Sequence, residues 1–178
     1  MKHFTTMLKT LVFQHLVKEQ PRVLFKKLPE KGTYTLIIFV SDKLKISVGR
    51  LGIKTFSSGY YVYTGSALGR GATSLPNRLA RHLKTLKRKH WHIDFLLANK
   101  NANIEAIAAV SSKEKIECKV NQLIKNKMKA KVLIPKFGAA DCKNKCKNHL
   151  LYFGNKGIKY DIRVLFKRNF GEHSTFLD

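Results

Sequence analysis

The segment GTYTLIIFV, residues 32–40, is rich in β-branched and aromatic side chains and therefore predicts a strand. A polar turn follows at 41–43, and LKISVGRLG, residues 44–52, then alternates apolar residues with polar or small ones. This alternation predicts a second strand, so we expect residues 32–50 to form an antiparallel hairpin. The tyrosine-rich segment YYVY, residues 60–63, predicts a third strand.

Helical patterns follow the third strand. The spacing predicts a helix that begins at 77, a helix over 92–98, a strand over 103–110 and a helix over 114–127. Ser74 would cap the first helix, whose buried stripe of leucines extends to Leu86, and Ser112 would cap the last helix. The later segment IRVLF, residues 162–166, has the composition of a strand. Because strands precede helices, we expect an α+β fold with a small three-stranded antiparallel sheet flanked by helices.

Composition and periodicity divide the chain into three regions. Residues 1–28 have helical spacing and predict an N-terminal helical extension. Residues 29–155 hold the main domain, and residues 156–178 form a C-terminal strand and tail. A chain of 178 residues with 44% hydrophobic content is long enough to bury one core.

The positive charge of the chain is its most unusual property. Thirty-five Lys and Arg residues against 11 Asp and Glu give a net charge of +24, which repels itself in the compact state. A polyanion would relieve this repulsion, and nucleic acid is the first candidate, whereas no isolated basic amphipathic helix favours a membrane. A lysine-rich proteome would also explain the charge. The residues that we expect to contact nucleic acid are Arg81, Lys84, Lys87, Arg88, Lys89 and Lys119.

The three cysteines indicate a reducing compartment, because their number is odd and no secretory signal is evident. Together with the charge, this predicts a cytoplasmic, nucleoid-associated protein. The spacing Cys142-x3-Cys146-x2-His149 is partly typical of zinc sites, and only Cys118 could add another thiolate. A buried structural turn is the alternative, and the sequence leaves both interpretations open.

Several blocks of sequence together resemble a known family. Gly32-Thr33-Tyr34 and Tyr63-Thr64-Gly65 resemble the paired motifs of the GIY-YIG nuclease superfamily. The segment NRLARH, residues 77–82, resembles its helix motif, and Ile116-Glu117-Cys118 resembles the block with its metal-binding glutamate. Further blocks resemble the Uri-type branch, which occurs in archaea and bacteria: VGRLG (48–52), SGYYVYTGSA (58–67), HWHIDFLL (90–97), FGAADC (137–142) and HLLYFG (149–154). The resemblance covers roughly residues 30–155.

The resemblance implies a metal-dependent endonuclease whose catalytic residues are Tyr34, Tyr63, Arg78, His82 and Glu117. Glu117 would bind one Mg²⁺ (or Mn²⁺), and Arg78 would grip the scissile phosphate. One of the two tyrosines would position or deprotonate the attacking water. His82 is an alternative base, because the ordinary pKa of histidine suits proton transfer near neutral pH.

The chain departs from the family pattern in ways that spare these side chains. Threonine replaces isoleucine in both signature triplets, and the segment between them is long. Strand alternation puts Tyr61 and Tyr63 on one face and Tyr60 on the other, and only Tyr63 lies beside the glycine turn. In HWHID (90–94), packing and capping compete with metal binding, and we expect packing.

We therefore expect a nuclease that recognises DNA structure during repair or processing, with DNA favoured over RNA and a repair protein as a further partner. A non-catalytic nucleic-acid-binding module that retains the fold is the main alternative. A structural zinc protein that docks onto a repair complex is a third hypothesis. The sequence leaves the oligomeric state open.

Overall fold

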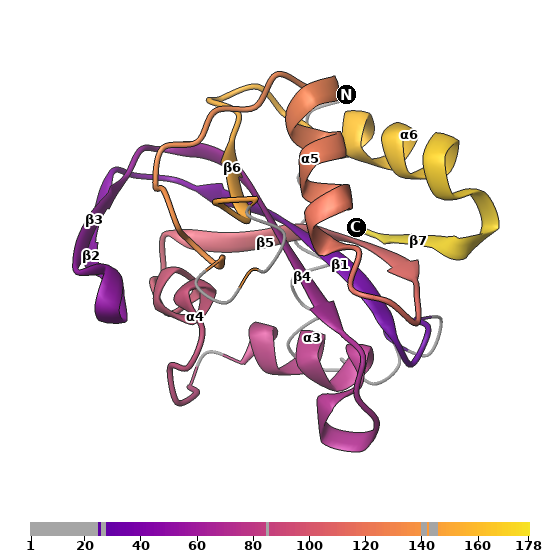
Figure 1. The fold of residues 1–178 in the computed structure, drawn as a ribbon. Coiled ribbons are helices and arrows are strands. Elements are labelled where there is room, and N and C mark those ends of the chain that lie inside the picture. The colour runs from indigo at the N-terminus through magenta and orange to yellow at the C-terminus, as the bar shows by residue number, and fades with distance from the viewer. Residues whose placement is uncertain (1–24, 26–27, 85, 140–141, 143–145) are drawn as a thin grey trace, which may run out of the picture.

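The computed structural model describes residues 25, 28–84, 86–139, 142 and 146–178. Its strands are β1 (Gly32–Val40), β2 (Leu44–Ser47), β3 (Ile53–Phe56), β4 (Gly59–Ala67), β5 (Ala102–Ser111), β6 (Leu150–Tyr152) and β7 (Ser174–Leu177). Its α-helices are α3 (Leu75–Leu83), α4 (His92–Leu97), α5 (Glu117–Lys127) and α6 (Lys159–Phe170). Strands and helices combine in one α+β fold, which confirms the expected class (Figure 1).

Five of the described strands form the main sheet, in the order β6-β4-β1-β5-β7, and all neighbouring pairs are antiparallel. The expectation of a three-stranded sheet was therefore wrong, because β6 extends it beside β4 and β7 extends it beside β5. In the central strand β1, Tyr34 lies opposite Gly65 of β4 and Ala109 of β5.

Helices cover both faces of this sheet, with α3 and α4 on one side and α5 and α6 on the other (Figure 1). The alternation of side chains along β1 explains the two layers. Tyr34, Leu36 and Ile38 join the core cluster that contains Leu75 and Leu79 of α3. Ile37, on the opposite face, packs in the cluster of α5 and α6, which includes Val120, Ile124, Ile162 and Phe166.

The short strand β2 pairs with β3 in a separate two-stranded sheet, so the predicted hairpin of residues 32–50 was wrong. Alternation identifies a strand but not its partner, and β4 and β5 flank β1 on both sides. Leu86, expected in the buried stripe of the first helix, is 92% exposed because α3 ends at Leu83.

Two helix assignments also differ from expectation. Residues 162–166 lie inside α6, where Ile162 and Phe166 are one turn apart on its buried face. The helix α5 begins at Glu117 rather than at 114, and Ile116 takes the N-cap position in place of Ser112. The C-terminal region 156–178 therefore contributes a helix and an edge strand to the main core.

The predicted N-terminal helix lies outside the described residues, apart from Phe25 and Leu28. Both of these side chains are buried in the core on the face of the sheet that α3 covers. Among the described residues, none of the helices is long and apolar enough to cross a membrane.

Candidate active site and metal-ligand cluster

Tyr34 and His82 meet in a buried hydrogen bond on the face of the sheet that α3 covers. The Tyr34 hydroxyl lies 2.8 Å from Nε2 of His82, and each residue is 2% exposed. β1 supplies the phenol and the last turn of α3 supplies the imidazole. Gly65 permits this approach, since a Cβ atom at that position would lie 2.6 Å from the Tyr34 hydroxyl oxygen. The expected turn at Gly65 was wrong, because β4 continues through it to Ala67, and the site instead requires the missing side chain of this glycine.

Asp94, at the start of α4, organises the groups behind His82. Its fully buried carboxylate accepts two hydrogen bonds from the Arg81 guanidinium, at 3.0 and 3.1 Å. The backbone N–H groups of His90 and Trp91 also donate to it. Nδ1 of His82 lies 3.6 Å from the same carboxylate. The result is a line of groups from phenol to imidazole to carboxylate.

Burial sets the charge states along this line. Burial raises the pKa of Tyr34 well above its ordinary value, with Tyr63 adding to the rise and Arg78 opposing it. Burial lowers the pKa of His82, although contact with Asp94 partly opposes the change. Burial alone would raise the pKa of Asp94, but contacts from His82 and Arg81 outweigh it and hold the pKa far below normal. At neutral pH the phenol and the imidazole are neutral, and the carboxylate is charged.

Arg78 and Tyr63 complete this side of the site. Arg78 precedes His82 by one helical turn, and its guanidinium lies 4.5 Å from the centre of the Trp91 ring. The Tyr63 ring, 6% exposed, lies with its centre 6.4 Å from that of Tyr34. The structure therefore brings four of the five predicted catalytic residues together.

Glu117 lies on the other face of the sheet. It is the first residue of α5, and its carboxylate accepts a hydrogen bond from the Ser66 hydroxyl. Ser66 and Gly65 are neighbours in β4, so the Glu117 carboxylate and the Tyr34 hydroxyl contact adjacent residues of one strand from opposite sides. Among the described residues, β6 pairs with β4 only as far as Tyr63, which leaves the outer edge at 65–67 without a strand partner. A ligand at this edge could approach both groups.

The predicted basic surface divides into exposed and buried members. Lys84, Arg88, Lys89 and Lys119 are exposed. Lys87 instead donates to the carbonyl of His82, and only 4% of its side chain is exposed. Burial lowers the pKa of Lys87 to about 8. Arg81 is committed to Asp94, so neither it nor Lys87 is displayed as an open phosphate contact.

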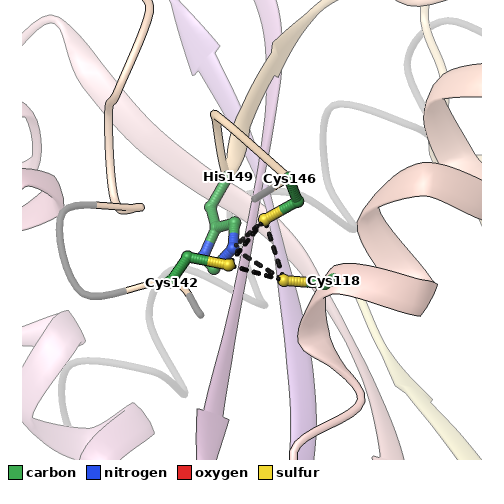
Figure 2. Close-up of side chains that lie close together, drawn as sticks. All are labelled: Cys118, Cys142, Cys146 and His149. Atoms are coloured by element: carbon green, nitrogen blue, oxygen red, sulfur yellow. Dashed lines mark hydrogen bonds between the residues drawn. The ribbon is translucent and has the colours of Figure 1, made fainter. Parts of the chain in front are cut away.

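The three cysteines and His149 form a compact cluster between α5 and the segment that precedes β6 (Figure 2). Their ligand atoms all lie within 4.8 Å of one another. The Sγ–Sγ separations are 2.8 Å for Cys118 to Cys146 and 3.0 Å for both pairs that involve Cys142. Nε2 of His149 lies 2.9 Å from the Cys146 sulfur. Among the described residues, this is the group in which three or more His, Cys, Asp or Glu side chains lie close enough together to hold a metal ion.

Two polar side chains of HWHID (90–94) bind other groups of the protein. His92 accepts a hydrogen bond at Nδ1 from the backbone N–H of Gly138, and Asp94 binds Arg81. The role of Asp94 as an organiser of His82 escaped sequence reasoning. Its position at the third residue of a helix was a signal for backbone capping only, because the sequence does not place α4 beside α3.

A basic concavity on the other side of the sheet was not predicted from the sequence. It has a volume of about 640 Å³ and lies between the end of α5, the end of β6 and α6. Two tyrosines, Tyr152 and Tyr160, line it together with basic side chains. These basic residues are Lys127, Lys129, Lys131, Lys156 and Arg168. The concavity lies on the α5 and α6 side of the sheet, away from Tyr34.

Comparison with known families gives a match over most of the chain. Residues 33–170 match the family described as domain of unknown function DUF123. The chain belongs to this family. The matched region begins next to Gly32 and includes every side chain of the candidate site and of the cysteine cluster. No curated protein and no solved structure matched the chain.

Proposed function

We propose that this DUF123 protein is a metal-dependent endonuclease that hydrolyses phosphodiester bonds in DNA. DUF123 is a GIY-YIG-like, nuclease-related family, which supports this class of activity. The observation that carries the proposal is the 2.8 Å contact between Tyr34 and His82, backed by Asp94 and flanked by Arg78. Hydrolysis of a phosphodiester needs a proton acceptor and a fixed positive charge, and these residues supply both.

One tautomer of His82 offers a route for the proton. A neutral His82 that accepts the Tyr34 proton at Nε2 carries its own proton on Nδ1, which faces Asp94. Transfer of the phenol proton to Nε2 would give a phenolate and an imidazolium. Burial opposes both charges, and the Asp94 carboxylate would stabilise the imidazolium. The phenolate then takes a proton from the attacking water, while Arg78 stabilises the charge that develops on the phosphate.

Glu117 and Ser66 fit the demands of Mg²⁺ (or Mn²⁺), because both offer oxygen atoms and Glu117 is partly exposed. A bound divalent ion would supply positive charge to the leaving oxygen. On this proposal the substrate phosphate lies at the open edge of β4, with Tyr34 and Arg78 on one side of the strand and Glu117 on the other.

The substrate proposal rests on charge. A net charge of +24 favours phosphate contacts that carry no sequence information. We therefore propose recognition of DNA structure during repair or processing, and a repair protein as partner. DNA is favoured over RNA.

A non-catalytic nucleic-acid-binding role is the second candidate. One observation favours it, since the Tyr34 hydroxyl that would act as base belongs to a residue only 2% exposed. A water molecule would need an opening at the edge of β4 in order to reach it. Both candidate functions predict nucleic-acid binding, and only the nuclease predicts cleavage.

A cleavage assay tests the proposal directly. Branched, single-stranded and duplex DNA and an RNA would each be incubated with Mg²⁺, with Mn²⁺ and with chelator. We expect metal-dependent cleavage of at least one DNA. Tyr34→Phe should lower its rate on the order of 10²-fold or more while DNA binding persists, because phenylalanine keeps the ring and removes the proton relay.

Paired control variants show whether a loss of cleavage comes from the catalytic group or from the substitution itself. Tyr160→Phe removes a hydroxyl from a residue 76% exposed on α6 and should cleave normally. Glu117→Gln should abolish metal-dependent cleavage, whereas Glu114→Gln, an exposed neighbour, should not. Binding without cleavage of any substrate would favour the non-catalytic role. Equal rates for Tyr34→Phe and Tyr160→Phe would remove the relay from the mechanism.

A further inference from the structure

The cysteine cluster lies where a loop of irregular chain meets α5. Between the end of α5 at Lys127 and the start of β6 at Leu150, the described residues form no helix or strand beyond one isolated bridge. Long segments of this kind are uncommon in compact domains unless they are stapled or functional. Cys146 and His149 lie in this segment, and Cys118 lies on α5. The cluster therefore joins the loop to a helix.

The convergence of four ligand atoms, rather than the sulfur separations alone, favours metal binding, because a disulfide would join only two of the three sulfurs. A disulfide requires sulfur atoms about 2.05 Å apart, and the three pairs here are 2.8 to 3.0 Å apart. In a tetrahedral zinc site with bonds of about 2.3 Å, sulfur atoms lie about 3.8 Å apart. An outward movement of each sulfur by less than about 1 Å gives that geometry. All three sulfur atoms and the imidazole nitrogen already face one point (Figure 2).

The donor set selects the metal. Three thiolates and one imidazole are soft ligands that favour zinc, whereas Mg²⁺ and Mn²⁺ prefer oxygen. The backbone also holds the histidine, since the N–H of His149 donates to Phe137 and its carbonyl accepts from Thr64. We propose that Cys118, Cys142, Cys146 and His149 bind one structural zinc ion.

The position of this zinc ion suggests a specific role. Cys118 follows Glu117, on the face of the sheet that α5 covers. The same loop passes to the other face, where Phe137 packs edge to face against Tyr63 and the N–H of Gly138 donates to His92. The zinc ion thus ties together the two sides of the β4 edge. If the protein is the nuclease proposed above, the zinc ion is a positioning element for Glu117 and Tyr63, and it is distinct from the Mg²⁺ (or Mn²⁺).

Metal analysis of the full chain tests the site without relying on activity. Protein purified under reducing conditions without chelator should contain one zinc per chain by elemental analysis. After removal of zinc, Co²⁺ should restore a tetrahedral thiolate–imidazole spectrum, with visible d–d bands and a near-ultraviolet thiolate-to-cobalt charge-transfer band. Removal of zinc should lower the Tm on the order of 10 °C, because a ligand that binds only the folded state stabilises it.

Thiol counting and variants complete the test. All three thiols should resist a thiol reagent in the zinc form and react after chelation. Cys142→Ser should lose zinc, whereas His173→Ala, an exposed histidine outside the cluster, should retain it. If Cys142→Ser does not fold, the Co²⁺ spectrum of the wild-type chain still decides.

Four outcomes separate the proposals. A zinc-free protein with a disulfide and one reactive thiol would overturn the site, as would three reactive thiols without metal. One zinc per chain in a protein that cleaves no substrate would support the zinc site and contradict the nuclease proposal. Cleavage by a protein that never holds zinc would support the nuclease proposal and contradict the zinc site.

Discussion

At the scale of single residues, the site depends on polar groups in a dry environment. Asp94 has no exposure, and the two charged neighbours that contact it, Arg81 and Lys87, have side chains 28% and 4% exposed. A charge removed from such a cluster leaves its partners without compensation, which costs more than the pair contributes at a surface. The Tyr34 to His82 contact is fixed by this arrangement.

Asp94→Asn should lower the free energy of unfolding by about 3 kcal/mol at pH 7, because it removes a buried negative charge that holds Arg81 and Lys87. Urea unfolding followed by fluorescence of Trp91, the single tryptophan, would measure the loss. Asp42→Asn changes an exposed aspartate and should cost little. Similar losses in the two variants would contradict the role of Asp94.

The same residues predict how stability depends on pH. Folding lowers the pKa of both His82 and Asp94, so the unfolded chain takes up protons that the folded chain refuses. Both groups therefore stabilise the fold above their unfolded pKa values, about 6.5 and 4. The free energy of unfolding should fall as the pH decreases from 7 to 4 and further below 4. In Asp94→Asn the second decrease should be smaller.

At the scale of helices and strands, local patterns predicted whether a segment is a helix or a strand. They failed to predict which distant strand it pairs with. β1, β4, β5, α3 and α4 were recognised within a few residues, because periodicity and composition are local. The pairing of β2 with β3 was missed, since strand alternation does not name a partner. IRVLF was missed because an apolar run suits a strand or one face of a helix.

The candidate site shows the same limit. Helical spacing predicts that residues of one motif, such as Arg78 and His82, share a helix face. The roles of Asp94 and of Cys118 depend on how α4 and α5 pack, which a single sequence does not reveal. The assignment of Glu117 to the opposite face of β4 from Tyr34 also required the sheet, since it follows from the contact with Ser66.

The loop before β6 offers a test at this scale. Gly138 has a φ of 73°, and a Cβ there would lie 2.8 Å from the Tyr63 ring. Gly154 has a φ of 69°, but a Cβ there would meet nothing within 4 Å. Gly138→Ala should destabilise the protein by about 2 kcal/mol more than Gly154→Ala, because only the former adds a clash to the backbone strain.

Thermal unfolding of the two glycine variants measures this difference, since the strain of a positive φ is common to both. The clash at Gly138 should also displace the loop that carries the cysteine cluster, and zinc content should fall with it. Equal stability of the two variants would mean that the loop does not pack against Tyr63.

At the scale of the whole molecule, the charge is spread over both layers. One exposed basic patch follows α3 and contains Lys84, Arg88 and Lys89. The other surrounds the concavity beside α6 and contains the exposed residues Lys129, Lys131 and Lys156. Composition gives the total charge, but it does not tell which of these two basic surfaces would bind nucleic acid.

Two triple variants with the same change in charge distinguish the layers. If DNA reaches the Tyr34 side, neutral residues at Lys84, Arg88 and Lys89 should lower the slope of log K against log salt by about 2 to 3 units. The triple variant at Lys129, Lys131 and Lys156 should leave the slope nearly unchanged. The opposite result would move the DNA to the α6 side and away from the proposed catalytic groups.

The order of the strands bears on how the chain is assembled. Of the strands that the structure describes, β1 is the first in sequence and the middle one of the main sheet, and β4 and β5 add to its two sides. β6 and β7 then add outside β4 and β5, respectively. Each later strand meets an edge that already exists, and none has to insert between two strands that are already paired. During ribosomal synthesis, this protein can therefore build its sheet outward in the order in which the strands emerge.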